Sequence, residues 1–353
     1  MPAATAFDRR TLFSRAALRA AGAEFLGGSS ATAAERRLEL TVARRAMACE
    51  FSLTFPAGLR GAVEAGCAAL DEVERLERKL SVYLEDSELS RLNREAAGAP
   101  VTADAEVYHL LRWAARLSAA TGGTFDAAGG ALVKAWGFSG GPHRIPSASD
   151  LHTALAASGS RHVLFDDPRR AIRFDCPGLE FNLGGIGKGF AIDRALHLIR
   201  TRRRIRCALM QGGQSSIKGI GSPPGEPRGW TVALCHPLHP DRPVARIRLR
   251  DRALGTSGAA NRFFVAQGRR YGHVLDPRTG WPARGLLGAS ALAGSATEAD
   301  ALSTAFFVMG VEGTRRFCEE HPEFGAVLVV PGKIRNAAPE VLAMGAVDAE
   351  VMV

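Results

Sequence analysis

The sequence predicts an α+β fold: a single large domain of mixed sheets and helices over residues 37–353. Segments with apolar residues at every third or fourth position, the period of an amphipathic helix, occur among short segments in which apolar and polar residues alternate, as in half-buried strands. The two kinds follow a mixed order, and no internal repeat or linker divides them into two cores. With 46% hydrophobic residues, the chain can bury a substantial core.

The first half of the domain begins with two predicted strands, at residues 38–42 and 50–55, where apolar and polar residues alternate. A long amphipathic helix follows, because apolar residues lie three or four apart at Val63, Cys67, Leu70, Val73, Leu76 and Leu80. A second helix is predicted over residues 107–117 and ends at Thr121-Gly-Gly123, since glycine accepts the left-handed conformation that stops helices. Short strands are expected at His162–Phe165 and Ala171–Phe174.

The second half begins with a glycine-rich segment, residues 182–189, which leads into a helix that continues to Ile199. Strands are predicted at 207–210, 230–235 and 245–250. In the last of these, Ile247 and Leu249 alternate with arginines, which indicates a sheet with one solvent-exposed face. Residues 221–227 form a surface loop by composition. A final helix is predicted from apolar residues at helical spacing over residues 301–309.

The net charge of +9 comes mostly from arginine, with a cluster at residues 200–206. No recognised nucleic-acid motif accompanies it, so we interpret the cluster as a solvated helix end and expect no nucleic-acid partner. The positive charge still favours phosphate-bearing substrates. Six cysteines lie far apart in the sequence without a CxxC pair, which argues against metal clusters and redox dithiols. We expect most of these cysteines to be small, buried hydrophobic residues. The sequence contains no run of eighteen apolar residues, so it predicts no conventional membrane span.

Residues 1–36 are interpreted as a leader or an extension. Asp8-Arg-Arg-Thr-Leu-Phe13 resembles a twin-arginine export signal, and an alanine-rich stretch with Ala31-Thr-Ala33 follows. Arg19 and Glu24 interrupt what would be the apolar region of such a signal, so a basic extension is the alternative. We expect a periplasmic protein, with the cytoplasm as the alternative location.

A candidate metal site lies in the final helix. Asp300 and Thr304 are four residues apart, so their carboxylate and hydroxyl point to the same face. Two oxygen ligands in this arrangement suit a hard cation such as Mg²⁺. By themselves, an Asp and a Thr in a helix are also typical of a cap and a surface residue.

The glycine segment Asn182-Leu-Gly-Gly-Ile-Gly-Lys-Gly189 is a candidate phosphate site. It matches neither the Walker loop nor the dinucleotide fingerprint. Its glycines nevertheless leave backbone N–H groups open to a phosphate, the following helix presents its positive N-terminus, and Lys188 adds a full charge. A glycine-rich structural turn is the alternative.

The segment His273-Val-Leu-Asp-Pro-Arg-Thr-Gly280 joins a strand end to a turn. Pro277 restricts the preceding residue to extended geometry, so Asp276 is held at a strand edge. The turn is also favourable for purely structural reasons, and His273 is equally compatible with a buried core histidine.

With these segments in this order, the chain resembles the ApbE family of flavin transferases over roughly residues 40–335. The resemblance includes Met47, Asp86–Asn93, Thr124-Phe-Asp126, Trp136-Gly-Phe138, the glycine segment, Gly212-Gly213, Thr256-Ser-Gly258, the segment 273–280 and Asp300-Ala-Leu-Ser-Thr304. It implies a T-fold-like domain. The sequence departs from the family pattern at Asn182, at Gly187 and at Ala259-Ala260-Asn261, which bears on flavin affinity and acceptor choice.

The resemblance implies an enzyme that uses FAD and Mg²⁺, moves FMN onto a Thr or Ser hydroxyl of an acceptor flavoprotein and releases AMP. The acceptor would carry an Asp-x-x-Thr/Ser-Gly-Ala-Thr/Ser motif and could itself be membrane-associated. Asp300, Thr304 and the carbonyl of Gly185 match the metal ligands. The positions implied for cofactor binding are Met47, Tyr83, Ser87, Glu88, Asp126, Gly185, Lys188, Asp193, Gly212, Gly213, Ser257 and His273.

The catalytic candidates are Lys188, which would take up developing charge, and three possible bases for the acceptor hydroxyl: Asp276, Asp300 and His273. The sequence does not choose among these bases. Two other functions stay open: an FAD pyrophosphatase, in which water attacks to give FMN and AMP, and a flavin-binding protein without turnover.

Overall fold

The computed structural model describes residues 39–258, 262–332 and 338–352, and its centre is an eight-stranded sheet in which every neighbouring pair is antiparallel. The sheet follows the order β1-β2-β6-β7-β10-β13-β14-β15. Its strands are β1 (Glu39–Ala46), β2 (Cys49–Pro56), β6 (Ala208–Gly212), β7 (Ser216–Ile220), β10 (Arg252–Gly258), β13 (Gly288–Ala293), β14 (Gly325–Val330) and β15 (Glu340–Gly345).

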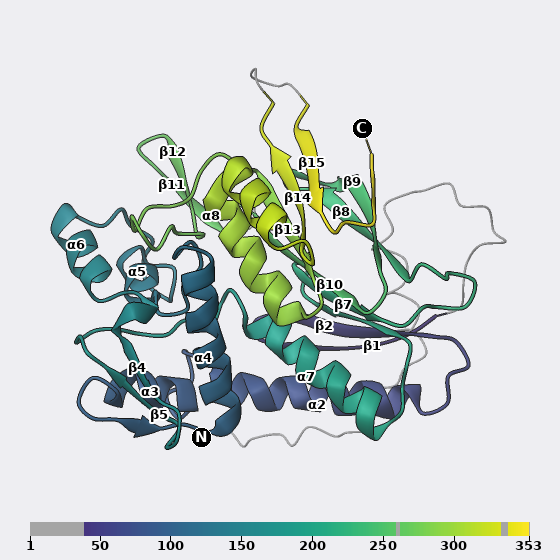
Figure 1. Ribbon diagram of the computed structural model, residues 1–353, viewed down its shortest axis with the longest axis horizontal. Coiled ribbons are helices and arrows are strands. Elements are labelled where there is room, and N and C mark those ends of the chain that lie inside the picture. The colour runs from purple at the N-terminus through teal and green to yellow at the C-terminus, as the bar shows by residue number, and fades with distance from the viewer. Residues whose placement is uncertain (1–38, 259–261, 333–337, 353) are drawn as a thin grey trace, which may run out of the picture. The chain divides into compact units, whose positions relative to one another are not determined.

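Three long helices cover one face of this sheet: α2 (Ala62–Leu80), α7 (Gly187–Arg202) and α8 (Ala296–Glu320) (Figure 1). A three-stranded sheet of β8 (Trp230–His236), β9 (His239–Leu249) and β16 (Ala349–Val351) covers the other. The alternation of side chains in β14 shows both layers, because Ala326 and Leu328 join the cluster that contains α8 residues, whereas Val327 and Val329 join the cluster of β8 and β9.

The remaining elements lie beside this layered core (Figure 1). They comprise four helices, α3 (Glu88–Glu95), α4 (Ala105–Ala120), α5 (Gly130–Ala135) and α6 (Ala148–Ala156), a 3₁₀ turn η2 (Ser160–His162), a small sheet of β3 (Val101–Thr102), β4 (Val163–Asp166) and β5 (Ala171–Phe174), and a hairpin of β11 (Phe263–Ala266) and β12 (Arg269–Gly272).

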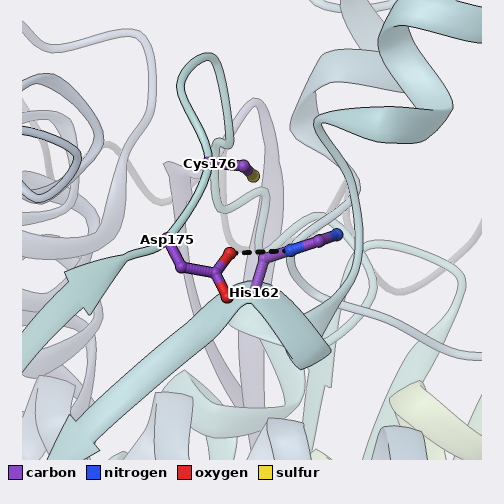
Figure 2. Close-up of side chains that lie close together, drawn as sticks. All are labelled: His162, Asp175 and Cys176. Carbon is purple, nitrogen blue, oxygen red and sulfur yellow. Dashed lines mark hydrogen bonds and ion pairs between the residues drawn. The ribbon is translucent and has the colours of Figure 1, made fainter.

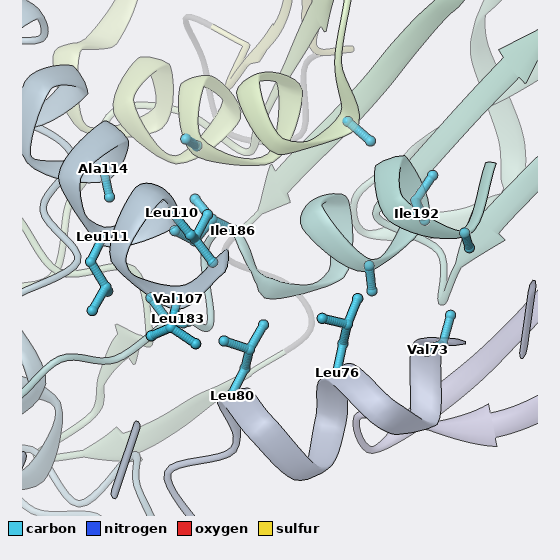
Figure 3. Close-up of a cluster of buried hydrophobic side chains, with 14 of the residues drawn as sticks. Val73, Leu76, Leu80, Val107, Leu110, Leu111, Ala114, Leu183, Ile186 and Ile192 are labelled. Carbon is cyan, nitrogen blue, oxygen red and sulfur yellow. The ribbon is translucent and has the colours of Figure 1, made fainter. Parts of the chain in front are cut away.

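One buried apolar cluster joins the helical elements to the sheet, so residues from Glu39 onward form a single compact unit. Figure 3 shows where α2, α4 and the glycine segment meet in it. Leu76 and Leu80 of α2 lie in this cluster with Leu110 of α4, and the glycine segment contributes Leu183 and Ile186. These two apolar residues anchor the glycine segment in the core, which fixes the position of the glycines between and after them.

The predicted α+β class is confirmed, as are the strands at residues 38–42 and 50–55 and the helices over 63–80, 107–117 and 301–309. The predicted apolar face of the first helix was partly wrong. Val63 is 40% exposed, while Ala62, Ala65 and Ala69 are buried, because small side chains let α2 approach the sheet closely. His162 lies in η2 and not in a strand, since pairing with β5 starts at Val163. The exposed arginine face of residues 245–250 is confirmed in β9.

The predictions for residues 1–36, including the export signal, and for Ala259-Ala260-Asn261 lie outside the described residues. Among the helices that the structure does describe, none is long and apolar enough to cross a membrane.

Candidate active site

The start of helix α8 is fixed by two sets of hydrogen bonds. Ser295 and Glu298 form a capping box, in which the Ser295 hydroxyl accepts from the Glu298 amide at 3.1 Å. The carboxylate of Asp193, in α7, accepts from the amides of Ala296 (3.0 Å) and Thr297 (2.9 Å). The Thr297 hydroxyl donates to the same carboxylate at 2.6 Å. These bonds satisfy N–H groups that have no partner within the helix and set the rotation of α8 about its axis.

The first turn of α8 also lies directly on the backbone of α7 and β10. A Cβ atom at Gly189 would come within 2.1 Å of the carbonyl oxygen of Ala296, and one at Gly255 within 2.2 Å of that of Ala299. Only glycine permits this approach. As a result the amide of Gly189 donates to Oδ2 of Asp300 at 2.8 Å, which places the carboxylate at the N-terminus of α7.

Asp300 is buried, with 5% of its surface exposed. Burial raises the pKa of its carboxyl group, while the nearby Lys188 charge and hydrogen bonds from the Ser216 hydroxyl and the Gly189 amide oppose that shift. Aspartate carboxylates are rarely buried without a compensating charge. At Asp300 the Lys188 charge and the two hydrogen bonds supply part of this compensation.

The other two predicted metal ligands lie next to each other. The Thr304 hydroxyl is 3.1 Å from that of Ser257, and a Cβ atom built on Gly185 would be 3.5 Å from Thr304 Oγ1. Since Asp300 and Thr304 are one helical turn apart, their side chains share one face of α8, and Gly185 lies beside Thr304. A carboxylate, a hydroxyl and a backbone carbonyl are oxygen ligands of the kind that Mg²⁺ binds, so this donor set fits the ion.

Lys188, the second residue of α7, lies within electrostatic range of Asp300 and His273. His273 is half-buried, and its Nδ1 atom is 3.1 Å from the carbonyl oxygen of Arg262. Because a carbonyl only accepts, Nδ1 carries the proton and Nε2 keeps its lone pair. Burial lowers the pKa of the His273 imidazole, and the charges of Arg262 and Lys188 lower it further.

The segment 273–280 forms the expected tight turn. Amides of Thr279 and Gly280 donate to the Asp276 carbonyl, and the Asp276 carboxylate accepts from Nε (2.9 Å) and Nη2 (2.8 Å) of Arg278. The indole of Trp136 donates to the carbonyl of Gly280 at 2.8 Å. Two segments 144 residues apart are thereby joined, and the Asp276 carboxylate is occupied by a charged partner.

Two surface hollows lie close to these groups. The larger, about 490 Å³, is lined by Arg269, Asp276, Thr279, Trp281, Pro282, Ala283, Arg284 and Val308. Val308 follows Thr304 by one turn of α8, so this hollow reaches the helix turn next to that predicted ligand. The smaller, about 220 Å³, includes Tyr83, whose side chain is largely solvent-exposed, and Asn182 at the start of the glycine segment.

Four predicted cofactor contacts are engaged within the protein. Ser87 caps α3 by accepting from the Ser90 amide at 3.0 Å, and Glu88 accepts from the amide of Asp104. The carboxylate of Asp126 accepts from the Ser118 hydroxyl, the Ala128 amide, and both the amide and hydroxyl of Ser160. Asp193 caps α8 and pairs with Lys218 at 2.7 Å. These bonds give all four a structural role, and their contact with a cofactor stays a prediction.

Three further predicted contacts, Met47, Gly212 and Gly213, lie at turns of the central sheet. Met47 adopts a left-handed conformation between β1 and β2, and its amide donates to Glu77 at 2.7 Å. Gly213 lies between β6 and β7, where a Cβ atom would meet the Cβ of Cys49 at 3.3 Å. A Cβ at Gly212 would meet the Phe51 ring at 2.8 Å.

The sequence did not single out Cys49, Glu77 or Ser216 as site residues. Lys188 and Asp300 lie in the electrostatic surroundings of the Cys49 thiol, whose pKa is raised chiefly by burial. Cys49 is only two residues after Met47, a predicted cofactor contact, and this proximity in the sequence could have indicated that Cys49 lies near the site. Ser216 and Glu77 reach the site through strand pairing and helix packing, which no local pattern reveals.

Comparison with known proteins identifies relatives of this chain. The model of the ApbE family matches residues 47–328. An FAD:protein FMN transferase of Treponema pallidum is 34% identical over 75% of this chain and 78% of its own length. One from Vibrio cholerae is 30% identical over 68% of this chain and 72% of its own.

Solved structures have the same fold. The crystal structure of the ApbE protein from Thermotoga maritima has a TM-score of 0.79 at 30% identity and covers 87% of this chain and 97% of its own. The flavinyl transferase ApbE of Pseudomonas stutzeri, at 24% identity, has a TM-score of 0.76 and covers 88% and 96%. The second likeness concerns the fold alone.

The hydrogen bonds of Asp193 lead to a prediction about its role. We expect Asp193→Ala to lower the free energy of unfolding by roughly 1–2 kcal/mol without ligand, because α8 keeps its capping box but loses the bonds from Asp193 to its first amides, and Lys218 loses its partner. Urea unfolding measures this, and Asp104→Ala, which removes the cap of α4, is the matched control. Unchanged stability together with lost FAD affinity would show that Asp193 serves the cofactor and not the helix.

Proposed function

Because this chain belongs to the ApbE family, we propose that it is an FAD:protein FMN transferase that moves FMN from FAD to a Thr or Ser hydroxyl of an acceptor flavoprotein and releases AMP. The observation that carries the proposal is the buried carboxylate of Asp300, which lies at the N-terminus of α7 with Lys188 and Thr304 close by. Cleavage of a pyrophosphate requires little from a protein beyond positioning and charge neutralisation. This site supplies both.

Asp300, Thr304 and the carbonyl of Gly185 would hold Mg²⁺. The ion would neutralise phosphate charge that the protein alone balances only with Lys188 and backbone amides. The raised pKa of Asp300 supports this assignment, because a buried carboxylate gains most from a neighbouring cation.

The N-terminus of α7 and Lys188 would bind the pyrophosphate of FAD. As the acceptor oxygen bonds to the phosphorus of the FMN half, the bond from that phosphorus to the bridging oxygen breaks and negative charge grows on the departing AMP. The helix N-terminus and the ammonium group of Lys188 stabilise this charge more strongly in the transition state than in the ground state.

We propose His273 as the group that takes the proton of the acceptor hydroxyl. The Asp276 carboxylate is paired with Arg278, and the Asp300 carboxylate already accepts from Gly189. His273 instead has Nδ1 bound to Arg262 and a lone pair on Nε2, and its lowered pKa keeps it neutral at pH 7. The hydroxyl proton moves to Nε2 as the new phosphorus–oxygen bond forms.

The larger hollow supports a protein acceptor in preference to water. Its opening beside Val308 and Asp276 gives a polypeptide segment access to the site, and its lining residues Arg269 and Arg284 complement the acidic residue that begins the acceptor motif. A pyrophosphatase needs no such surface. If residues 1–36 direct export, as their sequence predicts, the acceptor would be periplasmic or membrane-associated.

One experiment separates the three candidate functions. The full-length chain is incubated with FAD, Mg²⁺ and a flavoprotein that carries the acceptor motif, and the acceptor mass and AMP are measured. A transferase adds the mass of FMN to the acceptor and releases one AMP for each transfer. A pyrophosphatase releases AMP and free FMN without acceptor, and a binding protein releases neither.

The Asp300→Ala variant is the control for metal dependence in the same assay. It is expected to lose Mg²⁺-dependent transfer while it keeps its fold. Wild-type transfer by this variant at low Mg²⁺ would remove Asp300 from the metal site.

Lys188→Ala should lower the rate of flavin transfer at least about tenfold, which corresponds to roughly 1.4 kcal/mol of transition-state stabilisation. Lys188→Arg should restore the rate only in part, because a guanidinium is larger and differently shaped. Rates and FAD affinities are measured at saturating Mg²⁺. If both values for Lys188→Ala equal those of the wild type, Lys188 does not contact the pyrophosphate.

The pH profile tests His273. The rate should be level near pH 7 and fall as the pH drops below a midpoint that lies under 6.5, since the base acts only when neutral and burial lowers its pKa. His273→Gln should slow transfer by about 10²–10⁴-fold and abolish this acidic limb. Asp276→Asn should retain the limb. An unchanged acidic limb in His273→Gln would assign the proton transfer to another group.

A further inference from the structure

A cluster of three potential metal ligands lies at the open end of the β4–β5 hairpin, where β4 begins and β5 ends. These residues belong to other elements than Asp300, the predicted magnesium ligand. Val163 of β4 pairs with Phe174 of β5, and the pairing continues one step further, where the Asp175 amide donates to the His162 carbonyl at 3.0 Å. The side chains of His162 and Asp175 therefore emerge side by side, with Nδ1 and Oδ1 2.7 Å apart (Figure 2).

Cys176 adds a third potential ligand. The imidazole nitrogen, the carboxylate oxygen and the thiol sulfur all lie within 4.8 Å of one another. A tetrahedral Zn²⁺ ion, with bonds of about 2.0–2.3 Å, separates its ligand atoms by roughly 3.3–3.8 Å. The imidazole and carboxylate atoms, 2.7 Å apart, are closer than this and the other spacings are at most 4.8 Å, so small rotations of the three side chains would admit an ion.

The ligand types select the metal. Mg²⁺ and Ca²⁺ take oxygen ligands, whereas a nitrogen, an oxygen and a sulfur together suit Zn²⁺ and similar divalent transition metals. The side chains of His162 and Asp175 are 24% and 44% exposed, so water can reach the cluster and complete the coordination.

The charges around the cluster are compatible with a cation. Burial and the neighbouring Asp175 carboxylate raise the pKa of the Cys176 thiol, and Arg161 opposes that shift. A metal ion would displace the thiol proton to solvent, while the imidazole proton shifts to Nε2 and frees Nδ1 to bind. The bound ion would then neutralise the thiolate beside Asp175.

We propose that His162, Asp175 and Cys176 form a structural site for Zn²⁺ or a similar transition metal, separate from the predicted magnesium site. Its effect would reach the glycine segment through the residues between them. Ser160, in the same 3₁₀ turn as His162, donates to Asp126 from both its amide (2.8 Å) and its hydroxyl (2.6 Å). The residue before Asp126, Phe125, packs against Gly185, where a Cβ atom would be 3.3 Å from its ring. An ion bound to His162 would thus restrain η2, and through Ser160, Asp126 and Phe125 the position of Gly185.

The test uses the full-length chain with Co²⁺ as a spectroscopic substitute for Zn²⁺. We expect one Co²⁺ per chain that shows the charge-transfer absorption of a cobalt–thiolate bond and that Zn²⁺ displaces. His162→Gln and Cys176→Ser should weaken Zn²⁺ binding at least about tenfold, and Cys176→Ser should abolish the thiolate band. Asp175→Asn, which can still accept a hydrogen bond from His162, should weaken binding without loss of the fold.

Three control variants isolate the site. Cys67→Ser removes another half-buried cysteine, His152→Gln removes an exposed histidine, and Asp300→Ala removes the predicted magnesium ligand. All three should keep the thiolate band, and Zn²⁺ should raise the melting temperature of each but not that of Cys176→Ser. A band that is absent from the wild type, or that survives in Cys176→Ser, would overturn the proposal. This result is independent of flavin transfer, since no activity is measured.

Discussion

The candidate site depends on one close contact, in which the first turn of α8 crosses α7 and β10 at backbone distance. Any side chain at Gly189 or Gly255 would collide with a carbonyl of α8, so these two glycines decide how near the elements come. Asp193, one turn after Gly189 on α7, then caps α8 and sets its rotation. The carboxylate of Asp300 is thus positioned by α7 twice, through the Asp193 side chain that caps α8 and through the Gly189 amide that donates to Asp300 itself.

At the N-terminus of α7, the negative charge of the Asp300 carboxylate is partly compensated by neighbouring groups of the protein. Burial disfavours the ionised form of Asp300, while the α7 N-terminus, the Ser216 hydroxyl and the Lys188 ammonium favour it. The same amides and ammonium group are suited to phosphate. A bound cation would offset the negative charges of Asp300 and of the pyrophosphate, and the pyrophosphate would offset the positive charge of Lys188. Phosphoryl transfer requires such neutralisation of charge at the phosphate.

The sequence could predict what depends on local periodicity and spacing. The long helices, the strands at 50–55 and 230–235, and the shared face of Asp300 and Thr304 follow from side-chain period alone. It could not predict contacts made through tertiary packing, such as the bond between Gly189 and Asp300, 111 residues apart. For the same reason it could not predict the hydrogen-bond networks that Asp126 and Asp193, both predicted cofactor contacts, form within the protein. The wide spacing of the cysteines hid Cys176, which meets His162 only because β4 pairs with β5.

The two hollows are lined by different segments, each of which leads along the chain to a predicted metal ligand, and such an arrangement suits a reaction between two large partners. Asn182 in the smaller hollow precedes Gly185 by three residues, and Val308 in the larger follows Thr304 by four. Gly185 and Thr304 in turn lie against each other. In-line displacement requires that the nucleophile and the leaving group lie on opposite sides of phosphorus. A site reached through two separate hollows can hold a cofactor in one and admit an acceptor segment through the other, whereas hydrolysis would need only the first.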